Sequence, residues 1–156
     1  MRIWLGIDPG QSGAMAFIST GPKVMDFEDG ECISWLKAIS DQLISPLGKD
    51  YPQAKAVLEK VHSMPKQGVA SSFKFGMNFG IWRGRLEALG IPYDLVTPQK
   101  WQKVMFDSQT RGDRKAMSLD RARRLFPEMS DMLKRKKDHS RADALLIAEY
   151  CRRMDK

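Results

Sequence analysis

The chain has 156 residues, 42% of them hydrophobic, which is enough to fold around one core, so we expect a single domain over residues 1–156. No apolar stretch reaches the ~18 uncharged residues of a membrane span, and the first residues lack the layout of a secretion signal, so a cytoplasmic protein without a membrane partner is expected. The formal net charge is +7, and residues 101–156 carry fifteen Lys and Arg against nine Asp and Glu, which indicates a polyanionic partner or a solvated basic surface.

The order of apolar runs and turn residues predicts an α/β fold. The first two strands are joined by a short turn and should pair antiparallel, whereas later strands alternate with helices, so the sheet should be mixed. The expected strands cover residues 2–8, 14–19, 24–27, 54–61 and 93–96, and the expected helices cover residues 33–43, 71–89, 98–105, 115–126 and 142–154.

Three glycines interrupt the predicted helix 71–89. Gly76, Gly80 and Gly84 recur every four residues and therefore share one helix face. Glycine in a helix interior costs about 1 kcal/mol relative to alanine, and its usual benefit is the close approach of another backbone. That backbone could belong to the sheet, to a partner subunit or to DNA, and packing within the fold is favoured.

Three carboxylates lie at the edges of strongly apolar elements. Each has an ordinary explanation: Asp8 precedes a Pro-Gly turn, Glu59 could point to solvent, and Asp143 could form a capping box with Ser140 at the start of the last helix. Burying a lone carboxylate is costly unless it is paired or binds metal. The three together therefore indicate an acidic cluster.

The chemistry of this cluster predicts Mg²⁺, with Mn²⁺ as a substitute. Clustered carboxylates repel one another, and hard oxygen ligands select hard divalent cations. Cys32 and Cys151 lack the spacing of a zinc site, and a structural disulfide is not expected in a reducing compartment. Two such ions stabilise the attacking and leaving oxygens when a phosphodiester is hydrolysed.

The fourth metal ligand has two candidates. His139 would share a face with Asp143 if both lay on one helix, whereas Asp138 would be turned about 140° away. If Ser140 is the cap, both candidates precede the helix, and the carboxylate of Asp138 is then the better ligand for Mg²⁺. Asp138 is favoured on this ground, and His139 is kept as the alternative.

Basic residues near the predicted site could contact phosphate. Lys115 could stabilise charge that develops on the phosphate, although a basic side chain at a helix start is common on pattern alone. The other candidates for phosphate contact are Arg121, Arg123, Arg124 and the run Lys134–Lys137. Taken one at a time, each is more simply interpreted as a solvated surface residue.

Taken in register, these motifs resemble the RuvC family of Holliday-junction resolvases. The similar segments are Gly6–Gly13, Leu58-Glu59 and Arg141–Ala148, which span nearly the whole chain in the family's order. Leu125–Pro127, Leu133–His139 and Thr97-Pro98-x-x-Trp101 are similar to the phage and plastid members.

The resemblance implies an RNase H-like fold, with a mixed sheet of about five strands flanked by helices. It also implies a homodimer that uses Mg²⁺, and no small-molecule cofactor, to cut two strands of a four-way DNA junction. Many members place the fourth ligand where this chain has Ser140, whereas plastid-like members place it five residues before the last acid. The acids would then fall on Asp8, Glu59, Asp143 and one of Asp138 or His139, with Lys115 as the catalytic lysine. The loop 62–68 would lie near the junction centre, and the glycine-spaced helix could pack at the dimer interface.

Three other functions remain open at this point. The nearest is an RNase H-like nuclease that acts on RNA or on other branched DNA. A junction-binding module that has lost cleavage would also suit the basic charge, although the intact acids oppose it. An actin-like ATPase or sugar kinase shares the opening turn but needs two such domains and a far longer chain.

Overall fold

A computed structural model describes residues 2–10, 12–27, 30–44, 53–60, 68–106 and 112–155. The predicted loop 62–68 therefore lies outside the described residues, except for Gly68. The strands are β1 (Arg2–Asp8), β2 (Ala14–Ile18), β3 (Pro22–Asp26), β4 (Gln53–Glu59) and β5 (Tyr93–Val96). The helices are α1 (Glu31–Ile44), α2 (Val69–Ala88), α3 (Pro98–Met105), α4 (Arg114–Leu125) and α5 (His139–Met154), with short 3₁₀ helices η1 (Pro127–Leu133) and η2 (Lys136–Asp138).

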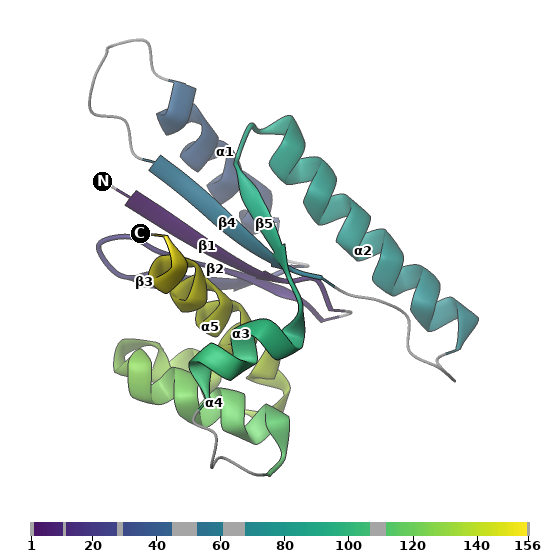
Figure 1. Ribbon diagram of the computed structural model, residues 1–156, viewed down its shortest axis with the longest axis vertical. Coiled ribbons are helices and arrows are strands. Elements are labelled where there is room, and N and C mark those ends of the chain that lie inside the picture. The colour runs from purple at the N-terminus through teal and green to yellow at the C-terminus, as the bar shows by residue number, and fades with distance from the viewer. Residues whose placement is uncertain are drawn as a thin grey trace.

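The five strands form one mixed sheet in the order β3-β2-β1-β4-β5. β2 pairs antiparallel with β1 and β3, as a hairpin requires, whereas β4 lies parallel to β1 and to β5. The predicted α/β fold with a mixed sheet is confirmed. Helices α1 and α2 lie on one face of the sheet, and α3, α4 and α5 lie on the other (Figure 1).

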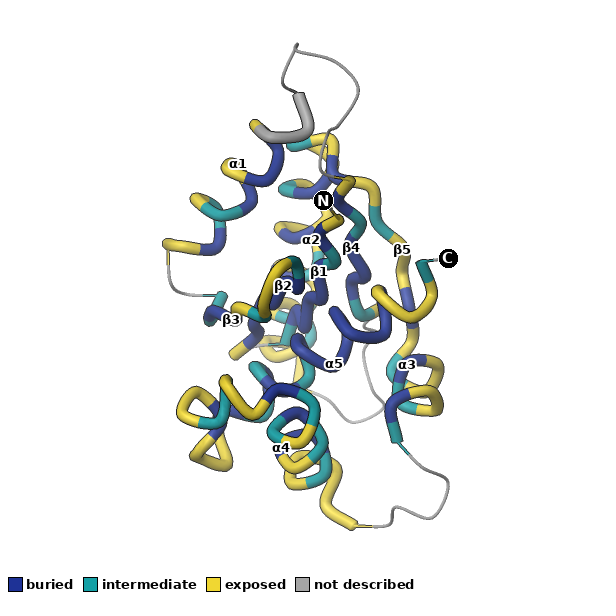
Figure 2. Tube along the Cα trace, turned by 90° about the vertical axis from the view of Figure 1, so that its left-hand side faces the viewer, coloured by how far each residue is buried: buried dark blue, intermediate teal, exposed yellow. Residues whose placement is uncertain are grey.

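Both faces of the sheet are covered, which explains why β1 and β2 are apolar and buried over most of their length. Ile3, Leu5 and Ile7 of β1 pack into the core beneath α1 and α2. The alternate residues face α5, which is buried along most of its length while α3 and α4 expose their outer sides (Figure 2). The side chains of β1 therefore divide between two cores.

Gly6 lets α5 lie directly on β1. A Cβ atom at this position would overlap the backbone nitrogen of Ala148 and the backbone oxygen of Ala144. The backbones of α5 and β1 thus touch without a side chain between them. This contact fixes the distance from α5 to the end of β1.

The last helix begins three residues earlier than predicted. α5 starts at His139, and its N-cap residue is Asp138, which makes no side-chain capping hydrogen bond. Ser140 therefore lies within the helix, so the capping box with Asp143 is wrong. The pattern misled because Ser and Asp three residues apart are equally compatible with a helix interior, where both face the sheet.

The expected packing of the glycine face of α2 is also wrong. A Cβ atom at Gly76, Gly80 or Gly84 would meet nothing within 4 Å among the described residues. α2 instead buries the side of the helix that carries Asn78, Trp82 and Leu86. The glycines lie on its open side.

Cys32 and Cys151 are both buried, and they lie in different cores on the two faces of the sheet, so they are not placed to bond each other. In the described part of the chain, no helix combines the length and apolar character needed to cross a membrane.

Candidate active site

Asp8 and Glu59 end two neighbouring parallel strands. β1 and β4 are paired up to Ile7 and Leu58, so the next residue on each strand emerges at the same edge of the sheet. Gly6 faces α5, and the alternation of β1 places Asp8 on that face too. This edge of the sheet and the first turns of α5 border the candidate active site.

The carboxyl group of Asp8 is buried and bonded to its own turn. Oδ1 accepts a hydrogen bond of 2.9 Å from the backbone N–H of Gly10. Burial raises the pKa of Asp8, while the hydrogen bonds from Gly10 and from the Ser140 hydroxyl oppose that rise. The net rise means that the effect of burial outweighs the two hydrogen bonds that favour the charged carboxylate.

Glu59 lies within electrostatic reach of Asp8. Burial raises the pKa of Glu59 to about 7, the charge of Asp8 adds to the rise, and a hydrogen bond from Trp101 opposes it. That bond runs from Nε1 of the Trp101 indole to Oε1 of Glu59 over 2.7 Å. Trp101 is fully buried, so it fixes one oxygen of Glu59 in place.

Asp143 reaches the same site from α5. Burial raises the pKa of Asp143 well above its usual value, and the charges of Asp8 and Glu59 add to that rise. The hydroxyl of Ser118 and the charge of Arg114 oppose it from α4. Oδ1 of Asp143 and Oγ of Ser118 are nevertheless buried without a hydrogen bond of normal geometry in the described structure.

The three carboxylates have the chemistry of a divalent-cation site. They offer only hard oxygen atoms, they raise one another's pKa, and Oδ1 of Asp143 is an unpaired buried acceptor. Within the described residues, no three His, Cys, Asp or Glu side chains are gathered closely enough to form a ready-made metal cage. The residues therefore fit Mg²⁺ or Mn²⁺, and an ion would draw together groups that repel one another without it.

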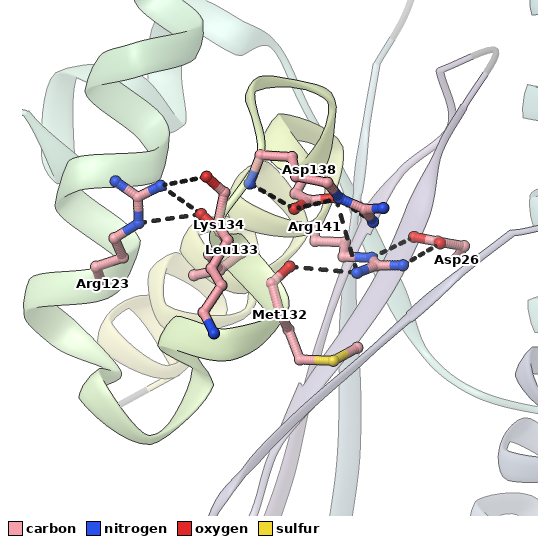
Figure 3. Close-up of polar contacts among 8 residues, drawn as sticks. Asp26, Arg123, Met132, Leu133, Lys134, Asp138 and Arg141 are labelled. Carbon is pink, nitrogen blue, oxygen red and sulfur yellow. Dashed lines mark hydrogen bonds and ion pairs between the residues drawn. The ribbon is translucent and has the colours of Figure 1, made fainter.

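The carboxylate of Asp138 lies in an ion-pair network with Arg135 and Arg141 (Figure 3). Its carboxylate accepts hydrogen bonds from the backbone N–H of Arg135 at 2.8 Å and from Nη2 of Arg135 at 2.9 Å. Nη1 of Arg141 lies 3.8 Å away, and Nε of Arg141 donates to Oδ1 of Asp26 at 2.7 Å. Burial raises the pKa of Asp138, but the hydrogen bonds from Arg135 and the charges of Arg135 and Arg141 outweigh it and lower the pKa overall.

His139 and Lys115 lie together beside the start of α5. Burial lowers the pKa of His139, and the charge of Lys115 adds to that effect while Asp113 opposes it. The imidazole is therefore neutral at pH 7, which is the form that binds metals. Nδ1 of His139 lies 3.5 Å from the hydroxyl of Ser140, the residue that also bonds Asp8.

Several of the basic residues that could contact phosphate are bonded within the fold. Nε of Arg121 donates to the carbonyl of Met105 at 2.9 Å, and Nε of Arg123 donates to the carbonyl of Leu133 at 3.0 Å (Figure 3). Ion pairs engage Arg124 with Asp120, Lys134 with Asp131, Arg135 with Asp138 and Lys136 with Asp113. The described residues provide no ion-pair partner for Lys115 or Lys137.

Comparison with known proteins relates this arrangement to the resolvases. No protein-family model matches the chain. The chain is 31% identical over 116 residues to "Holliday junction resolvase MOC1, chloroplastic" of Chlamydomonas reinhardtii, an alignment that covers 74% of this chain and 13% of that protein. Its fold matches T. thermophilus RuvC in complex with a Holliday junction substrate at a TM-score of 0.55 and 17% identity, covering 99% and 97% of the two chains. The resemblance to the RuvC family is confirmed.

A second Thermus thermophilus RuvC structure agrees, with a TM-score of 0.56 and 18% identity over 97% and 96% of the two chains. At this level of identity the RuvC structures show the fold, and the predicted RNase H-like fold with a mixed five-stranded sheet is confirmed. The chain spans only about 13% of the length of the MOC1 protein.

Three polar neighbours of the acids in the candidate active site were not predicted as such. They are Trp101 beside Glu59, Ser118 beside Asp143, and Asn78, whose amide bonds the turn that follows Asp8. The motif Thr97-Pro98-x-x-Trp101 was the only signal for Trp101, because its partner is 42 residues away in the chain. Nothing in the local pattern marks Ser118 or Asn78.

Proposed function

We propose that the chain is a metal-dependent DNA endonuclease that resolves four-way Holliday junctions by hydrolysing paired phosphodiesters. The observation that carries this proposal is the convergence of Asp8, Glu59 and Asp143, all with raised pKa values, on one edge of a RuvC-like sheet. The sequence match to a junction resolvase and the junction-bound RuvC structure support the choice of substrate. We further propose that residues 1–156 form one nuclease domain that works in the cytoplasm of a bacterial or phage-infected cell.

The proposed ligands of Mg²⁺, or of Mn²⁺ in its place, are Asp8, Glu59, Asp143 and one of Asp138 or His139. Bound ions would polarise the phosphodiester and lower the pKa of the attacking water. Trp101 holds Oε1 of Glu59, and the N–H of Gly10 holds Oδ1 of Asp8, so two ligands are oriented before an ion binds. For Asp138 to serve as the fourth ligand, the ion must compete with Arg135 for its carboxylate.

Lys115 is proposed to stabilise negative charge on the phosphate. It stands beside His139 and has no ion-pair partner in the described structure, so its ammonium is available to an anion. Lys137 is available in the same way, near the wall of a cavity of about 280 Å³ that Ser12, His139 and Ser140 also line. These two lysines are better candidates for phosphate contact than the arginines that hold the fold.

A homodimer is proposed through the open side of α2. Val69 is 88% exposed and Phe73 72%, and Met77 and Ile81 continue the same row at four-residue spacing. Gly76, Gly80 and Gly84 lie on this side and leave room for a second backbone. An apolar row of this kind favours association, and two sites are needed to cut two strands.

The dimer is tested by sedimentation of the wild-type chain and of Phe73→Glu. We expect the variant to sediment as a monomer, because the new charge lies within the apolar row. Val104→Glu on α3 is the matched control, since Val104 is also an exposed apolar residue, at 38%. Equal dissociation of both variants, or a monomeric wild type, would count against this surface.

The activity is tested by incubating a labelled synthetic four-way junction and a linear duplex of the same sequence with Mg²⁺ or with EDTA. We expect paired nicks near the crossover, only in the junction and only with Mg²⁺. Cutting that prefers flaps, RNA hybrids or single strands would indicate a nuclease with another substrate. Binding of the junction that is equal with and without Mg²⁺, and never followed by cutting, would indicate a binding module.

A further inference from the structure

Asn78 is a buried polar residue on the sheet-facing side of α2. Its side chain is only 7% exposed, and Nδ2 donates a hydrogen bond of 3.2 Å to the backbone oxygen of Gly10. The two residues are 68 positions apart, so the bond ties α2 to the turn that follows β1. Trp82 and Leu86 are buried on the same side of α2 and hold the helix against the sheet.

Gly10 takes part in three hydrogen bonds at that turn. Its N–H donates to Oδ1 of Asp8 at 2.9 Å, and its carbonyl oxygen accepts from the N–H of Gly13 at 3.0 Å as well as from Asn78. Gly13 has no room for a side chain, because a Cβ atom would overlap the backbone oxygen of Asp8. The turn is therefore tightly folded over the Asp8 carboxylate.

Gly10 has access to more backbone conformations than any other residue type. Within the turn its carbonyl is held by the N–H of Gly13, and Asn78 adds a second hydrogen bond from outside the turn. The bond from Asn78 holds the carbonyl on the other side of the same Cα atom. Fixing that carbonyl limits the rotation of Gly10 and so keeps its N–H directed at Oδ1 of Asp8.

We propose that Asn78 is a positioning residue, which orients the Asp8 carboxylate for metal binding through Gly10 and thereby links the seating of α2 to the candidate active site. This inference rests on the proposed function for its catalytic meaning. It also gives α2 two roles. One side of the helix carries the exposed apolar row, and the other side holds the turn after Asp8 through Asn78.

The simpler alternative is that Asn78 only satisfies a buried carbonyl. Ser40 provides the matched control, because its hydroxyl donates to the backbone oxygen of Leu89 at 2.8 Å and the residue is 3% exposed. Ser40→Ala and Asn78→Leu each remove one buried side-chain bond to a carbonyl. They differ because the carbonyl that Asn78 bonds belongs to Gly10, whose N–H bonds Asp8, whereas the carbonyl that Ser40 bonds belongs to Leu89.

The first test measures hydrogen exchange in the metal-free 156-residue chain without DNA. Asn78→Leu should speed exchange of the Gly10 amide by about tenfold relative to wild type, whereas Ser40→Ala should leave it unchanged. Asn78→His, which keeps an N–H donor at the same place along the side chain, should restore most of the protection. Unchanged exchange at Gly10 in Asn78→Leu would overturn the proposal.

The second test measures how junction cleavage depends on Mg²⁺ concentration. Asn78→Leu should raise the Mg²⁺ concentration for half-maximal cleavage by about tenfold while junction affinity stays the same, and Ser40→Ala should change neither. A loss of junction affinity with an unchanged Mg²⁺ requirement would contradict the positioning role. If the wild type cuts no junction, the proposed function fails, and the exchange at Gly10 still decides whether Asn78 holds the turn.

Discussion

Nε1 of Trp101 lies 2.7 Å from Oε1 of Glu59, and the tryptophan side chain is completely buried. The bond crosses from α3 to the end of β4 and directs one carboxylate oxygen before any ion is bound. Trp101→Phe removes the donor and keeps most of the apolar surface. Since a hydrogen bond to a charged group contributes about 1.5–3 kcal/mol, we expect the Mg²⁺ concentration for half-maximal cleavage to rise by about tenfold or more.

Trp82→Phe is the matched control for Trp101→Phe. Trp82 is equally buried, and its Nε1 has no hydrogen-bond partner in the described structure. The control should lose some stability through packing and keep its Mg²⁺ requirement. A similar Mg²⁺ shift in both variants would show that the Trp101 bond has no special role.

Glu59→Gln should stabilise the metal-free protein at pH 8. The folded-state pKa of Glu59 is raised from 4.5 to about 7, so the stability linked to this group is fully present below about pH 4.5 and is lost as pH rises through 7. The resulting loss of unfolding free energy at pH 8 is on the order of 3 kcal/mol. Thermal unfolding in EDTA should therefore show a higher Tm for the variant at pH 8 and equal values at pH 4. The opposite order at pH 8 would mean that Glu59 is already neutralised by a partner.

Asp8→Asn should abolish cutting and leave junction binding intact or improved. The substitution removes a metal ligand and a negative charge that lies where a phosphate would approach, while the amide keeps the size of the side chain. Cleavage and gel-shift assays on the same junction separate the two effects. Retained cutting would refute the assignment of Asp8 to the active site.

Gly6→Ala should disturb the candidate active site although residue 6 has no reactive side chain. The added methyl group would overlap the backbone of α5, so the helix must move away from β1 and carry Asp143 with it. We expect a loss of about 3 kcal/mol in unfolding free energy and a clear loss of cleavage in the protein that remains folded. Gly30→Ala is the control, because its methyl group would meet nothing within 4 Å in the described structure. Equal stability of the two variants in urea would contradict the contact.

Asp138→Asn should weaken the fold at pH 7 by about 1 kcal/mol, since Arg135 is mostly exposed and screened by solvent. The folded-state pKa of Asp138 is lowered, so its contribution is present above the ordinary value of 3.8 and disappears as pH falls further. The difference in stability from wild type should shrink in acid. A constant difference across the pH range would point to packing instead of charge.

Arg135→Gln tests whether Asp138 is the fourth ligand. Mg²⁺ that binds the folded protein raises its Tm. If Asp138 is a ligand, freeing its carboxylate should lower the Mg²⁺ concentration needed for that increase in Tm, and Asp138→Asn should make the increase smaller. If His139→Ala removes it instead, His139 is the ligand.

The positions of Asp8 and Glu59 could be predicted because each carboxylate ends an apolar run, and parallel pairing brings such ends together. The first residue of α5 could not be predicted, because the spacing of Ser140 and Asp143 fits a helix cap as well as a helix interior. The glycines of α2 indicated a close contact, yet the described fold leaves their side open. Trp101 and Asn78 act on partners 42 and 68 residues away, and local spacing carries no information on such pairs.

The direct contact of α5 with β1 at Gly6 makes the sheet edge and the helix one stiff body. Asp8 and Asp143 belong to the two elements that touch there, so a bound ion can draw their side chains together while their backbones have little freedom to follow a bound strand. If the site cuts DNA as proposed, the DNA must change shape to fit the site. The energy needed to bend a strand into the site then decides which DNA substrates are cut. A continuous duplex resists such bending, whereas the crossover of a branched molecule is already loosened, so selectivity can arise without reading a single base.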